Sequence, residues 1–149
     1  MHHVWSKGDY EISTDPARID VVLVHEFLTN SYWAKGISAE TVKKSIENSI
    51  CFGVYFGRQQ VGLARIISDL ATFAYLADVF IAPGYRGRGL SRWLLECILG
   101  HSDLHGLRRW MLATKDAHGL YEKLGFTTLK SPESWMEIHR PDIYAKGLK

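Results

Sequence analysis

The sequence of 149 residues predicts an α/β fold, in which one central mixed β-sheet is flanked by helices. Two observations support this class. Runs rich in β-branched and aromatic residues alternate with segments in which apolar residues recur at helical spacing. In addition, a strand, a helix and another strand follow one another between residues 73 and 114, an order that places two strands parallel in one sheet. The predicted order of elements is β-α-α-β-β-β-α-β-α-β-β.

The first predicted elements are a short strand and two helices. Tyr10–Ser13 is the strand. A capping residue ahead of a proline, in Thr14-Asp15-Pro16, indicates a helix start, and apolar residues at helical spacing continue this helix to Leu28. Ser38 opens a second helix that runs to about Asn48. We expect both helices to pack against the sheet.

Three strands follow. Residues 50–56 and 61–67 are rich in β-formers and are separated by a turn, so they predict a β-hairpin. Residues 73–82 form a longer run that is apolar apart from Tyr75 and Asp78. Such a run is typical of a strand that is buried on both faces, so we expect it at the centre of the sheet.

The remaining elements complete the predicted sheet. Residues 90–99 carry an apolar stripe and Gly100 ends this helix. Residues 107–114 are a predicted strand and residues 117–124 a short helix. Residues 126–129 and 135–139 are expected to form a final antiparallel pair. Since no repeat, linker or low-complexity segment interrupts the chain, residues 1–149 are expected to form a single domain.

Composition narrows the class of protein. The net charge of +2 is too small for nucleic-acid binding, which needs a concentrated basic face. No run approaches the length of a membrane span, and the first residues lack the apolar segment of a signal peptide. Cys51 and Cys97 have apolar neighbours, which favours buried free thiols and a reducing compartment. We therefore expect a cytoplasmic protein with no metal, no nucleic-acid partner and no membrane partner.

The most specific stretch is the loop before the helix at 90–99, which reads Pro83-Gly84-Tyr85-Arg86-Gly87-Arg88-Gly89-Leu90-Ser91. Its glycines let backbone N–H groups approach a ligand closely, and the first N–H groups of a helix have no partner within the helix. With the arginines and the helix dipole added, the loop predicts a phosphate or pyrophosphate site. It lacks the Gly-Lys-Ser/Thr ending of a P-loop and the spacing of a Rossmann fingerprint. The alternative is an ordinary glycine-rich turn with solvated arginines.

Two motifs resemble those of the GNAT superfamily of N-acetyltransferases. The family's cofactor loop, Arg/Gln-x-x-Gly-x-Gly/Ala, is met as Arg86-x-x-Gly89-x-Ser91, with a small serine at the final position. Further along, Leu120-Tyr121-Glu122-Lys123-Leu124-Gly125-Phe126 resembles the family's Leu-Tyr-x-x-Leu-Gly-Phe. The resemblance covers most of the chain, from the β-hairpin to residue 126. It implies a GNAT-like fold and an enzyme that uses acetyl-CoA.

The resemblance also implies which residues contact acetyl-CoA. The main chain of Phe80 and Ile81 would contact the pantetheine arm and donate an N–H to the acetyl oxygen. Thr114 occupies a position where many relatives carry an asparagine that binds the cofactor. The pyrophosphate would lie on the loop residues, namely Arg86, Gly87, Arg88, Gly89, Leu90 and Ser91.

One catalytic assignment follows from the same resemblance, and two candidate bases follow from the positions of the residues themselves. Tyr121 is the candidate general acid for the leaving thiolate, and the alternative is a packing tyrosine that only orients the cofactor. Asp78 is a candidate base acting through a water, or else it pairs with Arg65 or Arg109 for structural reasons. His118 is the rival base, one helical turn before Tyr121. An amine that arrives neutral needs neither base.

The acceptor is expected to be a primary amine, of a small molecule rather than of a peptide, that attacks acetyl-CoA directly in a ternary complex. Tyr32 and Trp33 are adjacent aromatic residues in a loop, which makes them a candidate substrate wall or, equally, a hydrophobic latch between helices. The alternative function is a catalytically silent sensor or scaffold that binds an acyl-CoA. The chain could also act as a homodimer.

Overall fold

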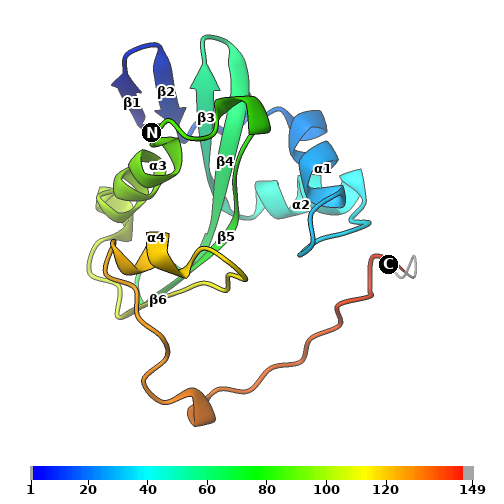
Figure 1. The fold of residues 1–149 in the computed structure, drawn as a ribbon, viewed down its shortest axis with the longest axis vertical. Coiled ribbons are helices and arrows are strands. Elements are labelled where there is room, and N and C mark those ends of the chain that lie inside the picture. The colour runs from blue at the N-terminus through cyan, green and yellow to red at the C-terminus, as the bar shows by residue number, and fades with distance from the viewer. Residues whose placement is uncertain (1, 146–149) are drawn as a thin grey trace.

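The computed structural model describes residues 2–145 and contains one six-stranded mixed sheet with helices on both faces (Figure 1), which confirms the predicted fold class. The strands are β1 (Val4–Lys7), β2 (Tyr10–Ser13), β3 (Ile50–Phe56), β4 (Gln59–Ser68), β5 (Phe73–Ile81) and β6 (Arg109–Met111). The α-helices are α1 (Val21–Thr29), α2 (Ala39–Glu47), α3 (Leu90–Leu99) and α4 (His118–Glu122).

The strands lie in the sheet in chain order, from β1 to β6. Neighbouring strands are antiparallel except β5 and β6, which run parallel because α3 crosses over between them. The β5–β6 ladder is short and ends at the pair Tyr75 and Met111. Within the part of the chain that the structure describes, residues 76–81 of β5 are therefore paired with β4 alone, and their other edge is open.

A β-bulge lies where β5 loses β6 as its neighbour. Asp78 and Val79 of β5 together face the single residue Ala64 of β4. Asp78 has φ of 55°, in the left-handed region, which aspartate tolerates better than a β-branched residue does. Because a bulge bends its strand, the part of β5 after Asp78 is directed away from β6.

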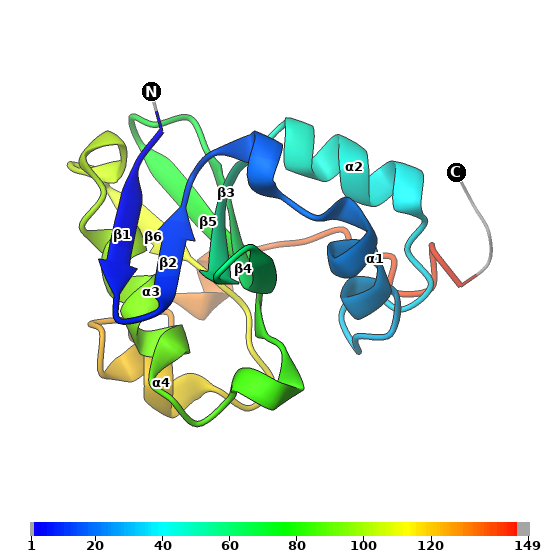
Figure 2. The same cartoon turned by 90° about the horizontal axis from the view of Figure 1, so that it is seen from above.

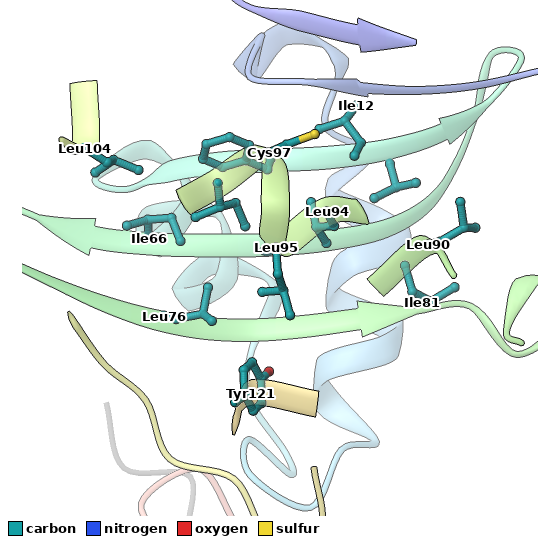
Figure 3. Packing of buried hydrophobic residues seen from close by; sticks show 14 of the residues in the cluster. Ile12, Ile66, Leu76, Ile81, Leu90, Leu94, Leu95, Cys97, Leu104 and Tyr121 are labelled. Carbon is teal, nitrogen blue, oxygen red and sulfur yellow. The ribbon is translucent and has the colours of Figure 1, made fainter. Parts of the chain in front are cut away.

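Each face of the sheet has its own core, and Figure 2 shows the helices of the two faces on opposite sides of the strands. Phe52 of β3, Leu76 of β5 and Leu94 of α3 belong to the core on the α3 face, part of which is drawn in Figure 3. Leu63 of β4 and Val24 of α1 belong to the core under α1 and α2. Since both faces carry apolar side chains, the strands read as apolar runs.

Two N-terminal features differ from the prediction. Strand β1, which pairs with β2, was not expected. The predicted helix start at Thr14-Asp15-Pro16 is wrong, because Asp15 caps only one 3₁₀ turn, which closes at an extended Ile19. Helix α1 begins at Val21, after Asp20 accepts a hydrogen bond from the N–H of Leu23. The second cap prediction is confirmed, since Ser38 accepts from the N–H of Thr41 at the start of α2.

The C-terminal prediction is also wrong. Residues 126–129 and 135–139 form no strand, and β6 is shorter than the predicted strand at 107–114. Instead, the segment from residue 127 to residue 145 runs along the outside of the molecule (Figure 1). Its far end returns to the protein at Tyr144, which packs against the core under α1 and α2 next to Gly36.

Candidate active site

The loop before α3 forms a cradle of unpaired backbone donors. Gly87 and Gly89 have φ of 78° and 76°, a conformation that favours glycine. The N–H groups of the four residues from Gly89 to Arg92 have no acceptor within residues 2–145, and the first bond into the helix is from Trp93 to the carbonyl of Gly89. Such a helix start attracts a phosphate through its N–H groups and its dipole. The geometry fits the predicted pyrophosphate site.

The three arginines near this cradle have different partners. Arg86 donates from Nε to the carbonyl of Ile81 at 2.9 Å, so it ties the loop back to the end of β5. Arg88 donates to the hydroxyl of Tyr10 at 3.0 Å and thereby links the loop to β2. Arg92 pairs with Glu96 along the helix surface. Arg86 therefore shapes the loop. The hydrogen bond from Arg88 to Tyr10 could not be predicted from the sequence, because it joins residues far apart in the chain.

The open edge of β5 presents the main chain of Ile81. The next residue, Ala82, donates its N–H to the carbonyl of Val61 at 2.7 Å, on the β4 side. Because backbone groups alternate along a strand, the N–H and carbonyl of Ile81 point to the opposite side, where the carbonyl meets Arg86. The main chain of Phe80 then faces β4, and its side chain lies in the core under α1 and α2.

Tyr121 lies beside β5, on the side away from β4 (Figure 3). Its side chain is buried in the α3-face core, and its ring contacts that of Phe126. Burial raises the pKa of Tyr121, and the neighbouring hydroxyl of Tyr32 raises it further. The Tyr121 hydroxyl donates no hydrogen bond to any residue that the structure describes, so it is a protonated donor free to serve a ligand.

The loop between α1 and α2 crosses the open edge of the sheet. The hydroxyl of Tyr32 accepts a hydrogen bond from the N–H of Lys115 at 3.2 Å, ahead of α4. Trp33 donates from Nε1 to the carboxylate of Asp78 at 2.8 Å. Tyr32 and Trp33, which were predicted as a possible substrate wall, therefore lie close to Tyr121 and to β5, although these segments are far apart in the sequence.

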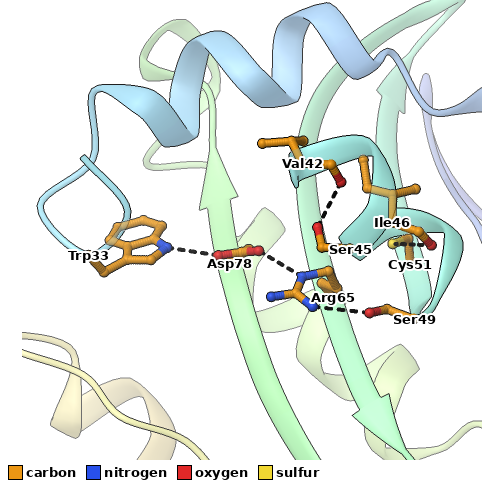
Figure 4. A network of polar contacts seen from close by, with 8 residues as sticks. All are labelled: Trp33, Val42, Ser45, Ile46, Ser49, Cys51, Arg65 and Asp78. Carbon is orange, nitrogen blue, oxygen red and sulfur yellow. Dashed lines mark hydrogen bonds and ion pairs between the residues drawn. The ribbon is translucent and has the colours of Figure 1, made fainter. Parts of the chain in front are cut away.

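The carboxylate of Asp78 is already engaged by two donors (Figure 4). Arg65 donates from Nε to one oxygen at 2.8 Å, while Trp33 donates to the other. Arg65 also bonds Ser49 at 3.0 Å, which fixes the guanidinium between β4 and the end of α2. Of the two partners that the sequence suggested, Arg65 is the one found. Arg109 instead lies over the ring of Trp135, 4.7 Å from its centroid.

The remaining predicted residues lie at the start of α4. His118 is the first residue of this helix and its side chain is exposed, whereas Tyr121 one turn later is buried. Thr114 accepts a hydrogen bond from the N–H of Ala117 at 3.1 Å, so it holds the turn that precedes α4. Its own hydroxyl hydrogen can still be donated to a ligand.

One aromatic residue of the site was missed. Phe27 of α1 stacks on Phe80, with ring centroids 3.9 Å apart, and is 6.1 Å from the ring of Trp33. In the sequence, Phe27 belongs to the apolar stripe of a helix, and such a residue is predicted to lie in the core. Only the packing of α1 on β5 shows that its ring joins those of Trp33 and Phe80.

These features suit acetyl-CoA. An unpaired helix start can hold a pyrophosphate, and an open strand edge beside it can bond the amides of an extended chain.

No group of three or more histidine, cysteine or acidic side chains in residues 2–145 is arranged to hold a metal ion. Among the same residues, no helix has both the length and the apolar character needed to cross a membrane.

Comparisons with known proteins agree with this geometry. The GNAT acetyltransferase domain family matches residues 47–128. A crystal structure of a candidate GNAT acetyltransferase from Xanthomonas campestris pv. campestris is 47% identical, covers 91% of this chain and 96% of its own, and superposes with a TM-score of 0.90. A candidate acetyltransferase of Gibberella zeae is 37% identical over 80% of this chain and 79% of its own length.

A third relative is the thialysine N-epsilon-acetyltransferase of Caenorhabditis elegans, 24% identical over 83% of this chain and 85% of its own length. The family match covers more than half of the residues and includes the loop and Tyr121. By fold, by motif and by these relatives, the chain belongs to the GNAT acetyltransferase family.

Proposed function

We propose that this protein transfers the acetyl group of acetyl-CoA to a primary amine of a small molecule, by direct attack within a ternary complex. One observation carries the proposal. The side chain of Tyr121 is buried, but its hydroxyl has no protein partner among the described residues, and it lies on the open side of β5, the same edge at which Ile81 presents its N–H. A hydroxyl that the protein neither pairs nor encloses can donate a hydrogen bond to a ligand at this edge.

Acetyl-CoA would bind along the edge that runs from the cradle to Tyr121. The N–H groups from Gly89 to Arg92 would hold its pyrophosphate, with Arg88 adding positive charge. The N–H of Ile81 would donate to the acetyl oxygen, and the hydroxyl of Thr114 would contact the pantetheine chain of acetyl-CoA from the other side. These contacts orient the thioester toward the loop that carries Tyr32 and Trp33.

The chemistry then needs three contributions from the chain. As the amine nitrogen bonds to the thioester carbon, the N–H of Ile81 stabilises the charge that develops on the oxygen. When the carbon–sulfur bond breaks, Tyr121 gives its proton to the departing thiolate. The proton lost by the amine is taken by a base, and Tyr121 is reprotonated from solvent. Binding both reactants side by side supplies the remaining acceleration.

The state of the two cysteines favours direct attack of the amine on acetyl-CoA over a mechanism in which a cysteine of the enzyme is first acetylated. Cys51 and Cys97 are both buried and free. Burial raises the pKa of Cys51 to about 12 and that of Cys97 to about 11, so neither offers a thiolate at neutral pH. We therefore propose no covalent intermediate.

For the base we propose His118. Both oxygens of the rival residue, Asp78, accept hydrogen bonds from Arg65 and Trp33, so Asp78 serves the structure. The imidazole of His118 is exposed at the start of α4, one turn from Tyr121. An exposed imidazole can exchange its proton with solvent after each turnover.

The acceptor is inferred from the wall of the site. Phe27, Trp33 and Tyr32 form a series of ring contacts next to β5, which suits an amine with an apolar body. The relative from Caenorhabditis elegans is named for acetylation of an N-epsilon amine, which supports an amine acceptor here. We further propose that the whole chain works as one domain in the cytoplasm.

The test is release of thiol from acetyl-CoA across a panel of primary amines, for wild type, Tyr121→Phe and Tyr144→Phe. We expect Tyr121→Phe to lower kcat by about 100-fold with unchanged binding of acetyl-CoA. The control, Tyr144→Phe, changes a tyrosine on the opposite core and should keep full activity. Tight binding of acetyl-CoA without turnover of any amine would favour the silent sensor instead.

A further inference from the structure

A lysine is folded onto the aromatic residues that line the acceptor site, which is the space beside Tyr32 and Trp33. Lys115 lies in the loop between β6 and α4, and its N–H donates to the hydroxyl of Tyr32 at 3.2 Å. Its ammonium lies over the ring of the same tyrosine, 5.4 Å from the centroid. A lysine that extended into water would keep more side-chain entropy, so these two contacts define where the charge is held. The ammonium therefore lies at the rim of the acceptor site.

The charge of Lys115 is not paired within the protein. Among the described residues, no ion pair includes Lys115, although Asp116 is its neighbour in the chain. A ligand bound against Tyr32 would remove water from one side of this ammonium, which is unfavourable unless the ligand replaces the lost interactions. A ligand that brings a negative charge does so, whereas a ligand with a second positive charge is repelled.

The nearest acidic side chain of the site does not offset this charge. Both oxygens of Asp78 accept hydrogen bonds, one from Trp33 and the other from Arg65 (Figure 4). The Arg65 guanidinium neutralises the Asp78 carboxylate, and both side chains are largely buried. Since this ion pair has no net charge, Lys115 sets the sign of the charge beside Tyr32.

We propose that the amine acetylated by this protein carries a carboxylate, and that Lys115 binds this carboxylate. The inference rests on the proposed N-acetyl transfer and adds the second functional group of the acceptor. The apolar part of the acceptor would lie against Tyr32 and Trp33, with its carboxylate at Lys115 and its amine directed toward Tyr121. A single ammonium matches the single charge of a carboxylate. Such a contact selects between ligands more than it strengthens binding.

The test compares, at each of several chain lengths, three linear amines that differ only at the far end: an ω-amino acid, the alkylamine and the diamine. One such set is ε-aminocaproate, n-hexylamine and hexamethylenediamine, whose reacting amines have nearly the same basicity. Thiol release from acetyl-CoA gives kcat/KM for each amine at low and at high salt. We expect wild type to prefer the ω-amino acid of at least one set by about 5-fold, the size of one exposed ion pair. High salt should reduce this preference.

Variants of Lys115 show whether its charge causes the preference. Lys115→Met should abolish it, Lys115→Arg should keep it, and Lys115→Glu should reverse it in favour of the diamine. The control is Lys43→Met, which removes the same charge from an exposed lysine of α2 that takes part in none of the contacts of Tyr32 or Trp33. It should keep the wild-type preference. If Lys115 served only the structure, Lys115→Met would lower the rates with all three amines equally, and the inference would be wrong.

Two further results would overturn the inference while leaving N-acetyl transfer intact. The first is a wild type that acetylates amines but prefers no ω-amino acid at any chain length. The second is a preference that persists in both Lys115→Met and Lys115→Glu. Turnover of no amine, with acetyl-CoA still bound, would instead overturn the proposed function and this inference with it. The wild-type comparison and its salt dependence decide the question even if a variant does not fold.

Discussion

Asp78 and Arg65 form an ion pair across β4 and β5, with 2.8 Å between the carboxylate oxygen and Nε. The pair lies at the β-bulge, and the Asp78 and Arg65 side chains are only 9% and 16% exposed. Asp78 also has the left-handed backbone that the bulge requires, with φ of 55°. One residue therefore combines a buried charge with a strained main chain, at the point where β5 parts from β6.

Substitutions of Asp78 separate these two contributions. Asp78→Asn tolerates the left-handed backbone but leaves the Arg65 charge uncompensated, so we expect a loss of about 3 kcal/mol in the free energy of unfolding. Asp78→Ala should cost about 1 kcal/mol more, because alanine is strained at this φ. Denaturant unfolding followed by tryptophan fluorescence measures both. If Asp78→Asn were as stable as wild type, the ion pair would have no structural role.

Gly89→Ala tests the cradle. The added Cβ meets no atom within 4 Å, but φ of 76° is unfavourable for alanine, so the loop must rearrange. We expect acetyl-CoA to bind about 10-fold more weakly in calorimetry.

Gly106→Ala is the matched control for this change. Gly106 has φ of 77° and equally open space around its Cβ, but it lies beyond the far end of α3. The two variants should lose similar stability, while Gly106→Ala keeps its affinity for acetyl-CoA. Equal loss of affinity in both would remove the cradle assignment.

His118→Gln tests the proposed base. We expect kcat/KM to fall by about 10 to 100-fold and the acid limb of the pH–rate profile to disappear. Asp78→Asn, studied where it remains folded, should keep that limb because its wild-type carboxylate is held by Arg65 and Trp33. The reverse pattern would make Asp78 the base.

His101 predicts a pH dependence of stability. Burial lowers the pKa of His101, and the neighbouring His3 lowers it further. As pH falls, the unfolded chain then takes up the proton before the folded one does. The stability is therefore complete above the ordinary imidazole range and is lost as pH falls through it.

The measurement is the Tm at about pH 7.5 and about pH 5.5 for wild type and His101→Asn. Asparagine can still accept the hydrogen bond that the Nδ1 of His101 accepts from the N–H of Asp103. Wild type should lose a few degrees more than the variant over this range. An equal drop in both would assign the pH dependence to other groups.

The open helix start after the glycine-rich loop could be predicted from the sequence because it depends on local rules. Glycines ahead of an amphipathic helix specify an open helix start wherever the helix lies. The C-terminal strand pair shows the opposite case. Its residues have strand character, but strand pairing needs a partner edge, and residues 126–129 and 135–139 pair with no strand among the described residues.

The site residues divide in the same way. Asp78 could be recognised as an unusual acid in an apolar strand, but its choice of Arg65 over Arg109 depends on the register between β4 and β5. Phe27 could not be distinguished from core, since its stacking on Phe80 depends on how α1 crosses the sheet.

The sequence by itself determined the fold class, the family motifs and the order of most elements, because hydrophobic periodicity and turn residues act over short stretches of chain. Only the tertiary structure decided the bulge at Asp78, the open edge of β5 and the bridge from Tyr32 to the start of α4. These depend on strand register and on contacts between segments distant in sequence, which no local pattern encodes.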